Sequence, residues 1–193
     1  MSQLNLWKKH LGSVPESVWN RINLEVLILA DNDLHEISKS IGGLKKLRTL
    51  DLGHNQLTSL PESLGDLDGL TDFLYLHDNR LTSLPSSLKK LTRLTYLNIS
   101  SNAFALLPDC VTTLSGLVEL RVTDNTLTTL PDSVGMLREL RQLDLRGNPL
   151  PSWPASIAAL PRLEKLDLRW VTTLDPPPPW IENLKARGCL VYF

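Results

Sequence analysis

Asp31, His54 and Asp78 are the residues whose types and spacing most suggest a chemical site. Their numbers differ by 23 and 24, so they recur at nearly equal intervals along the chain. Carboxylate oxygens and imidazole nitrogens are common ligands of divalent metals, so these three side chains could hold a cation if the fold stacked them. The same column continues with Ser101 and Asp124, however, and a polar column of this kind is more often a solvated hydrogen-bond ladder. We therefore expect no metal and no cofactor.

No motif in the sequence indicates catalysis. There is no glycine-rich phosphate loop, no His-Glu-x-x-His motif and no nucleophile elbow. Cys110 would need a histidine beside it to act as a nucleophile, and no histidine occupies an equivalent place nearby. We predict that the chain has no catalytic residues and is not an enzyme.

The composition of the chain argues against nucleic acid and membrane partners. The net charge of its 193 residues is −1, and acidic residues offset the arginines, so there is no basic stripe. No apolar run reaches the roughly 20 residues that cross a bilayer. The two cysteines, Cys110 and Cys189, are about three repeats apart, too far for a disulfide. This indicates a reducing compartment, which we expect to be the cytoplasm; delivery into a host cell as an effector is the alternative.

The feature that must position all these side chains is a repeated phrase, Leu-x-x-Leu-x-Leu-x-x-Asn-x-Leu-x-x-Leu-Pro. The numbers of its successive asparagines differ by 23, 24, 23, 23 and 23. A period of this length is the signature of a solenoid, in which each unit packs only on its neighbours. The asparagines, which we expect to form a structural ladder, are Asn32, Asn55, Asn79, Asn102, Asn125 and Asn148.

The alternation inside the phrase predicts one short strand per unit. Its fourth and sixth positions are apolar, as in Leu50 and Leu52, and should point inward while their neighbours point outward. The asparagine after the strand can satisfy buried backbone groups with its amide. The Leu-Pro step and apolar residues three apart then suit a return by short 3₁₀ or helical turns. The predicted fold class is an α/β solenoid of about eight units, with a parallel concave sheet and a convex side of such turns or extended chain.

We expect a single domain over residues 1–193. Lys9 and Val171 replace the asparagine in the first and last units, which marks terminal units. Residues 1–23 should form an N-terminal capping-like repeat, residues 24–162 six regular repeats, and residues 163–193 the last repeat and a C-terminal cap. We expect the cap to comprise a short helix over residues 180–187, ended by Gly188, and then a strand or extended tail.

Two further features concern the middle and the ends of the solenoid. The one longer interval between asparagines, from Asn55 to Asn79, predicts a bulge around residues 71–73. The four prolines at 176–179 are interpreted as a stiff connector, with a PxxP ligand for an aromatic groove as the alternative. We expect a monomer, although the uncovered first strand could instead pair with another subunit to give a dimer.

Function should lie on the outward positions of the concave sheet, because the core does not dictate their identity. Tyrosine and arginine, which are enriched in binding hot spots, occur there in the central and C-terminal units. Asn98 is expected to face solvent. Alternatively, Tyr75 and Tyr96 could serve only to cover the sheet, and Arg146 could pair with Asp144 or Asp167. The residues predicted to contact a partner are Ile28, Asp51, Phe73, Tyr75, His77, Tyr96, Asn98, Arg121, Arg146 and Arg169.

The repeated phrase, with Leu-Pro-x-x-Leu-Gly-x-Leu in its second half, resembles the 23-residue type of leucine-rich repeat. Plant intracellular Ras-group-related proteins, animal Ras-pathway scaffolds and bacterial leucine-rich repeat proteins carry similar units. The resemblance implies a non-catalytic scaffold that binds another protein, with small GTPases and signalling enzymes as candidate partners. The alternative is a partner-recognition segment of a larger kinase, GTPase or ubiquitin-ligase type enzyme.

Overall fold

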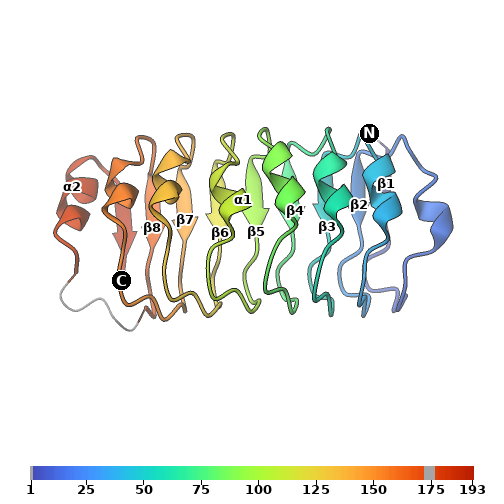
Figure 1. Ribbon diagram of the computed structural model, residues 1–193, viewed down its shortest axis with the longest axis horizontal. Coiled ribbons are helices and arrows are strands. Elements are labelled where there is room, and N and C mark those ends of the chain that lie inside the picture. The colour runs from blue at the N-terminus through green and yellow to red at the C-terminus, as the bar shows by residue number, and fades with distance from the viewer. Residues whose placement is uncertain (1, 172–176) are drawn as a thin grey trace.

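The computed structural model describes residues 2–171 and 177–193, which form a solenoid with one strand per unit (Figure 1). All neighbouring strands are parallel, and their order in the sheet is their order in the chain. The nine strands of the described residues are β1 (Gln3–Asn5), β2 (Val26–Ile28), β3 (Thr49–Asp51), β4 (Phe73–Tyr75), β5 (Tyr96–Asn98), β6 (Glu119–Arg121), β7 (Gln142–Asp144), β8 (Lys165–Asp167) and β9 (Leu190–Tyr192).

Short helical turns line the side opposite the sheet, as the three-residue apolar spacing predicts (Figure 1). A proline precedes most of them, with φ near −60° to −72°, which suits the first turn of a helix. Ser38 takes this place in the second unit and accepts a hydrogen bond from the Ser40 N–H. The turns are η1 (Glu16–Val18), η2 (Lys39–Gly43), η3 (Glu62–Asp66), η4 (Ser86–Lys90), α1 (Asp109–Thr112), η5 (Asp132–Met136), η6 (Ala155–Ala159) and α2 (Trp180–Ala186).

The core is a column of leucines between the sheet and the turns. Leu50 of β3 and Leu52 just after it are fully buried, as are the equivalent residues of the neighbouring units. One continuous apolar cluster runs from Val18 to Cys189. The predicted fold class, a leucine-rich solenoid with a parallel sheet, is therefore confirmed.

The asparagines of the repeated phrase form a hydrogen-bonded ladder between units. The Asn55 amide donates to the carbonyls of Leu29, Leu52 and Gly53 at 3.0–3.1 Å. Its Oδ1 accepts from the backbone N–H groups of Asn32 and Leu34. Each such side chain thus satisfies backbone groups in its own unit and in the preceding one. The same arrangement recurs at Asn79, Asn102, Asn125 and Asn148, while Asn32 bonds to the first unit.

The residue before each asparagine, and before Lys9 and Val171 at the same place in the terminal units, adopts the left-handed conformation. Its φ lies between 51° and 66° in every unit, a value that costs energy for most side chains but that Asp, His and Gly tolerate. This turn directs the following asparagine into the core. The residues are Lys8, Asp31, His54, Asp78, Ser101, Asp124, Gly147 and Trp170.

The extra residue of the fourth unit is accommodated just ahead of β4. The N–H groups of Thr95 and Tyr96 donate to two different carbonyls, those of Thr71 and Asp72. In the next unit the equivalent N–H groups share a single carbonyl, that of Thr95. Thr71 and Asp72 therefore stand opposite one residue, so the predicted bulge is confirmed, while β4 itself pairs in uninterrupted register.

Both described ends of the column are partly covered. The predicted C-terminal helix and strand are confirmed as α2 and β9, with Gly188 at φ 87° between them. At the other end Trp19 is buried, whereas Trp7 is exposed. The proline connector includes Pro176, which lies outside the described residues. Among the described residues, no helix has both the length and the apolar character needed to traverse a bilayer.

The hydrogen-bonded ladder predicts that replacing Asn102 lowers the free energy of unfolding more than replacing Asn98 does. Asn102 makes four hydrogen bonds, three as donor and one as acceptor, whereas Asn98 accepts one from the Ser100 N–H. The expectation that Asn98 faces solvent is wrong, because it is only 9% exposed, so the contrast rests on bonding rather than burial. We predict that Asn102→Ala lowers the free energy of unfolding by about 2–3 kcal/mol and Asn98→Ala by about 1 kcal/mol. Urea unfolding would measure both, and equal losses would contradict the ladder.

Candidate functional site

The central part of the concave face carries three aromatic rings, here called the aromatic cluster: Phe73, Tyr75 and Tyr96. They come from outward positions of β4 and β5, which are neighbours in the sheet. Ring centroids lie 5.9 Å apart for Phe73 and Tyr75, 5.4 Å for Phe73 and Tyr96, and 5.0 Å for Tyr75 and Tyr96. These separations are typical of favourable aromatic pairs, so the three side chains form one apolar surface.

The members of the aromatic cluster differ in exposure. Phe73 is 41% exposed, which makes it the most accessible of the three rings. Tyr96 is only 9% exposed, because the other two rings and the Arg121 guanidinium, 5.7 Å from its centroid, cover it. Burial raises the pKa of the Tyr96 phenol to about 12. For Tyr96 the structure therefore favours the alternative that it covers the sheet over direct partner contact, and it supports the two rings that are accessible.

The predicted arginines are paired with acidic residues on the same face. Each acid lies two positions earlier and therefore points the same way. The Arg121 Nε contacts Glu119 at 2.6 Å, and Arg146 and Arg169 each make two bonds of 2.7–2.9 Å to Asp144 and Asp167, respectively. The arginines thus form a rim of fixed, neutralised ion pairs rather than free cations.

Asp167 is the most buried acid of this rim, at 1% exposed. Burial alone would raise its pKa, but hydrogen bonds from Arg169 and the charges of Arg169 and Arg146 outweigh that effect. The pKa of the Asp167 carboxyl therefore lies below its ordinary value. Arg146 Nε also lies 3.7 Å from its Oδ2, so two arginines share this carboxylate.

The N-terminal part of the face is less distinctive. Ile28 and Asp51 lie on β2 and β3, directly across from one another in the sheet, and both are half-buried. The Asp51 carboxylate accepts a hydrogen bond from the Gly53 N–H at 2.9 Å. The structure thus brings the central predicted residues into contact but leaves Ile28 apart from the aromatic rings.

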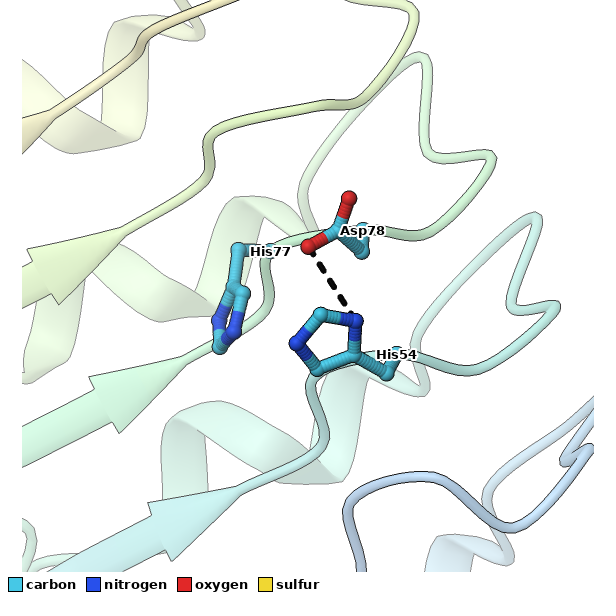
Figure 2. Close-up of side chains that lie close together, drawn as sticks. All are labelled: His54, His77 and Asp78. Carbon is cyan, nitrogen blue, oxygen red and sulfur yellow. Dashed lines mark ion pairs between the residues drawn. The ribbon is translucent and has the colours of Figure 1, made fainter.

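The structure does not group Asp31 with His54 and Asp78, although the three residues occupy the same repeat position. Asp31 lies beside Lys8, at 3.9 Å, and is not part of a three-residue cluster with His54 and Asp78. Instead His77 joins those two residues, as Figure 2 shows. The His54 Nδ1 is 3.2 Å from Asp78 Oδ2, and the two imidazole centroids are 4.7 Å apart.

Two exposed aromatic residues at the C-terminal end were missed by sequence reasoning. Trp170 is 69% exposed and lies within 6 Å of the guanidinium groups of Arg146 and Arg169. Tyr192 of β9 is 41% exposed and contacts Arg169 and Lys165. Trp170 occupies the left-handed position of the last unit, so following that column to its end would have found it. Tyr192 follows the final repeat, where the periodicity gives no signal.

The convex side has a shallow hollow of about 330 Å³ between η4 and α1. Cys110 lines it but is itself buried, and burial raises the pKa of its thiol to about 11. A thiol with so high a pKa is a poor nucleophile at neutral pH. The hollow therefore offers no activated group.

Because Arg146 and Arg169 share the Asp167 carboxylate, the loss of unfolding free energy caused by Asp167→Asn should depend on pH. Because the folded-state pKa of Asp167 is lowered, its ionised form stabilises the fold above the ordinary carboxyl pKa of about 3.9, and this contribution is lost as the pH falls below it. We expect the variant to lose on the order of 1.5 kcal/mol of unfolding free energy at pH 7, and progressively less as the pH falls from about 3.9 through the lowered folded-state pKa. Thermal unfolding across pH would measure it. Glu164→Gln, which removes one partner of an exposed ion pair with Arg141, is the control and should change the unfolding free energy by less than about 0.5 kcal/mol. A loss for Asp167→Asn that does not vary with pH would contradict the stabilising role of the ionised Asp167 carboxylate.

Known proteins resemble this chain over all or part of its length. A model described as leucine-rich repeat region matches residues 4–126, and one described as leucine rich repeat matches residues 115–170. The volume-regulated anion channel subunit LRRC8E of Xenopus tropicalis is 36% identical over 74 residues, which is 37% of this chain but only 9% of the channel subunit. Fibromodulin of Sus scrofa is 30% identical over 105 residues, 53% of this chain and 69% of fibromodulin.

Solved structures give the same result for the fold. The leucine-rich repeat domain of the type III effector XopL superposes with a TM-score of 0.80 at 26% identity, covering 98% of this chain and 75% of that one. A leucine-rich repeat protein of Leptospira interrogans superposes with a TM-score of 0.71 at 28% identity, covering 86% of this chain and 54% of its own. The Arabidopsis receptor kinase HAESA, solved with a peptide hormone and a co-receptor, gives 0.69 at 30% identity, covering 81% and 27%. Given its repeat, its solenoid and the family models that match it from residue 4 to residue 170, the chain belongs to the leucine-rich repeat family.

Proposed function

We propose that this leucine-rich repeat domain is a non-catalytic scaffold that binds a protein partner on its concave face. Domains of this family generally serve as protein-interaction modules. The contact surface would be centred on the aromatic cluster and bounded by the ion pairs of Arg121, Arg146 and Arg169. A central apolar anchor within a polar rim is the usual anatomy of a protein–protein interface.

The observation that carries the proposal is the exposure of Phe73 beside Tyr75. A 41% exposed phenylalanine in ring contact with a half-buried tyrosine presents apolar area that the core does not use. Both side chains are held by β4 and by the buried Tyr96 beneath them, so little side-chain freedom would be lost on binding. Aromatic residues held in this way are frequent hot spots.

The charges around the aromatic cluster favour a partner with a mixed polar surface. Because Glu119, Asp144 and Asp167 neutralise the three arginines, the rim has no excess of one sign for a strongly acidic or basic partner. Nucleic acid is accordingly not the expected ligand. The resemblance to scaffolds of Ras-type pathways makes a small GTPase or a signalling enzyme a candidate partner.

A second candidate function is partner recognition within a larger effector or signalling enzyme. It is supported by the superposition on the repeat domain of the type III effector XopL over 98% of this chain. The same concave face would then select the substrate or target of another domain. Extending the coding sequence in both directions would separate the two functions, because an adjoining catalytic domain is required only by the second.

We further propose that the protein works in a reducing compartment, the cytoplasm. The support is that Cys110 and Cys189 are free and buried thiols.

The proposal predicts that replacing accessible concave residues weakens binding without unfolding the chain. Neighbouring repeats supply tolerated substitutes: Thr49 stands where Phe73 does, and Asp51 where Tyr75 does. We expect the double variant Phe73→Thr, Tyr75→Asp to lose a partner that wild type captures from native lysate. Titration of that purified partner should show a loss of at least about 2 kcal/mol, or about thirtyfold in Kd.

The matched control is Met136→Lys, which changes an exposed apolar residue of η5 to the residue found at the same place in η4, Lys90. It should leave Kd unchanged. Equal affinity of the concave double variant and wild type for every captured protein would refute concave-face binding.

A further inference from the structure

A compact group of nitrogen and oxygen ligands lies on the concave edge where β3 and β4 end. His54 follows β3, and His77 and Asp78 follow β4, as Figure 2 shows. One donor atom from each of the three residues lies within 4.8 Å of the others. This group is separate from the aromatic cluster of the proposed function, although Tyr75 borders it with a ring contact of 6.1 Å to His77.

The backbone holds the three side chains in place. His54 and Asp78 occupy the left-handed position of successive units, so their side chains leave the sheet edge in the same way. Their Nδ1 and Oδ2 atoms are 3.2 Å apart. Two ligands of a tetrahedral metal with bonds of about 2.1 Å are separated by about 3.4 Å, so this pair already spans one ligand edge.

His77 completes the group from the neighbouring position. Its imidazole lies against the backbone of Gly53, where an added Cβ would come within 2.9 Å of three ring atoms. Because Gly53 has no side chain, the ring can approach His54 edge to face, with centroids 4.7 Å apart. Because one donor atom of His77 already lies within 4.8 Å of the other two donors, a small rotation of its side chain would bring that atom to ligand distance.

The unsatisfied hydrogen-bonding capacity of His77 indicates that it can accept a cation. Its Nδ1 is buried and has no hydrogen-bond partner among the described residues, which is costly for a polar atom and would be relieved by a metal bond.

We propose that His54, His77 and Asp78 form a binding site for a divalent transition-metal cation such as Zn²⁺. Two imidazoles and one carboxylate suit a borderline metal, whereas Mg²⁺ and Ca²⁺ require mostly oxygen ligands. Three protein ligands leave at least one coordination position open. That position faces solvent, since the His54 and Asp78 side chains are 55% and 43% exposed, so water or a partner's side chain could occupy it.

Isothermal titration of the chain with ZnCl₂, after dialysis against EDTA and then metal-free buffer, tests the proposal. We expect one Zn²⁺ per chain with Kd below about 100 µM, no heat with MgCl₂, and a higher Tm with Zn²⁺ than in EDTA. Saturation with several ions per chain, or no saturable binding, would overturn the proposal.

The ligand variants are His54→Ser and His77→Ser. The repeat that follows β4 carries serine at both repeat positions: Ser101 at the position of His54 and Ser100 at the position of His77. The fold therefore accommodates both changes. Each should weaken Zn²⁺ binding more than about tenfold while keeping the wild-type Tm in EDTA.

His10→Ser is the matched control, because His10 also lies beside a carboxylate, 3.5 Å from Asp33, but belongs to no three-residue ligand group among the described residues. It should bind Zn²⁺ as wild type does. Binding that survives both ligand substitutions, or that falls equally with His10→Ser, would show only nonspecific attachment to surface histidines and would refute the site.

Discussion

The asparagine side chain that bridges consecutive units is the interaction on which the rest of this structure depends. Each strand is only three residues long and each convex turn at most seven, so neither element could persist alone. The amide of Asn55 ties three carbonyls and two N–H groups of two units together in the core. Leucine burial supplies the driving force for stacking, but the asparagines fix the geometry at which units stack. The concave columns are regular because this spacing is constant.

That regularity explains why so much of the fold could be predicted from the sequence. A short, nearly constant period with a fixed asparagine leaves few alternatives to a solenoid. Even the extra residue at Thr71–Asp72 could be located, because one interval between asparagines is longer than the others. The terminal helix and strand were predictable for a different reason, since Gly188 gives a recognisable stop signal. The left-handed residue of each unit was not foreseen, because Lys8, Ser101 and Trp170 are not among the residue types that usually adopt it.

The candidate site was predictable by position but not by contact. Repeat numbering places Phe73, Tyr75 and Tyr96 on one face, yet it cannot show that two rings and an arginine bury the third. The same limit applies to Asn98, which occupies an outward position and is nevertheless buried. His77 was predicted only to contact a partner on the concave face, whereas the absence of a side chain at Gly53 lets it also approach His54. These outcomes depend on the sizes of neighbours one repeat away, which no single column reveals.

Hydrogen–deuterium exchange with and without a bound partner would test concave-face binding most directly. Backbone amides of β4, β5 and β6 and of the residues that follow them lie beneath the aromatic cluster and Arg121, the rim arginine that contacts it. The account predicts that added protection is concentrated in these three units and is small in η3, η4 and η5 on the convex side. Protection concentrated in the convex turns, or along β1 at the edge of the sheet, would contradict it.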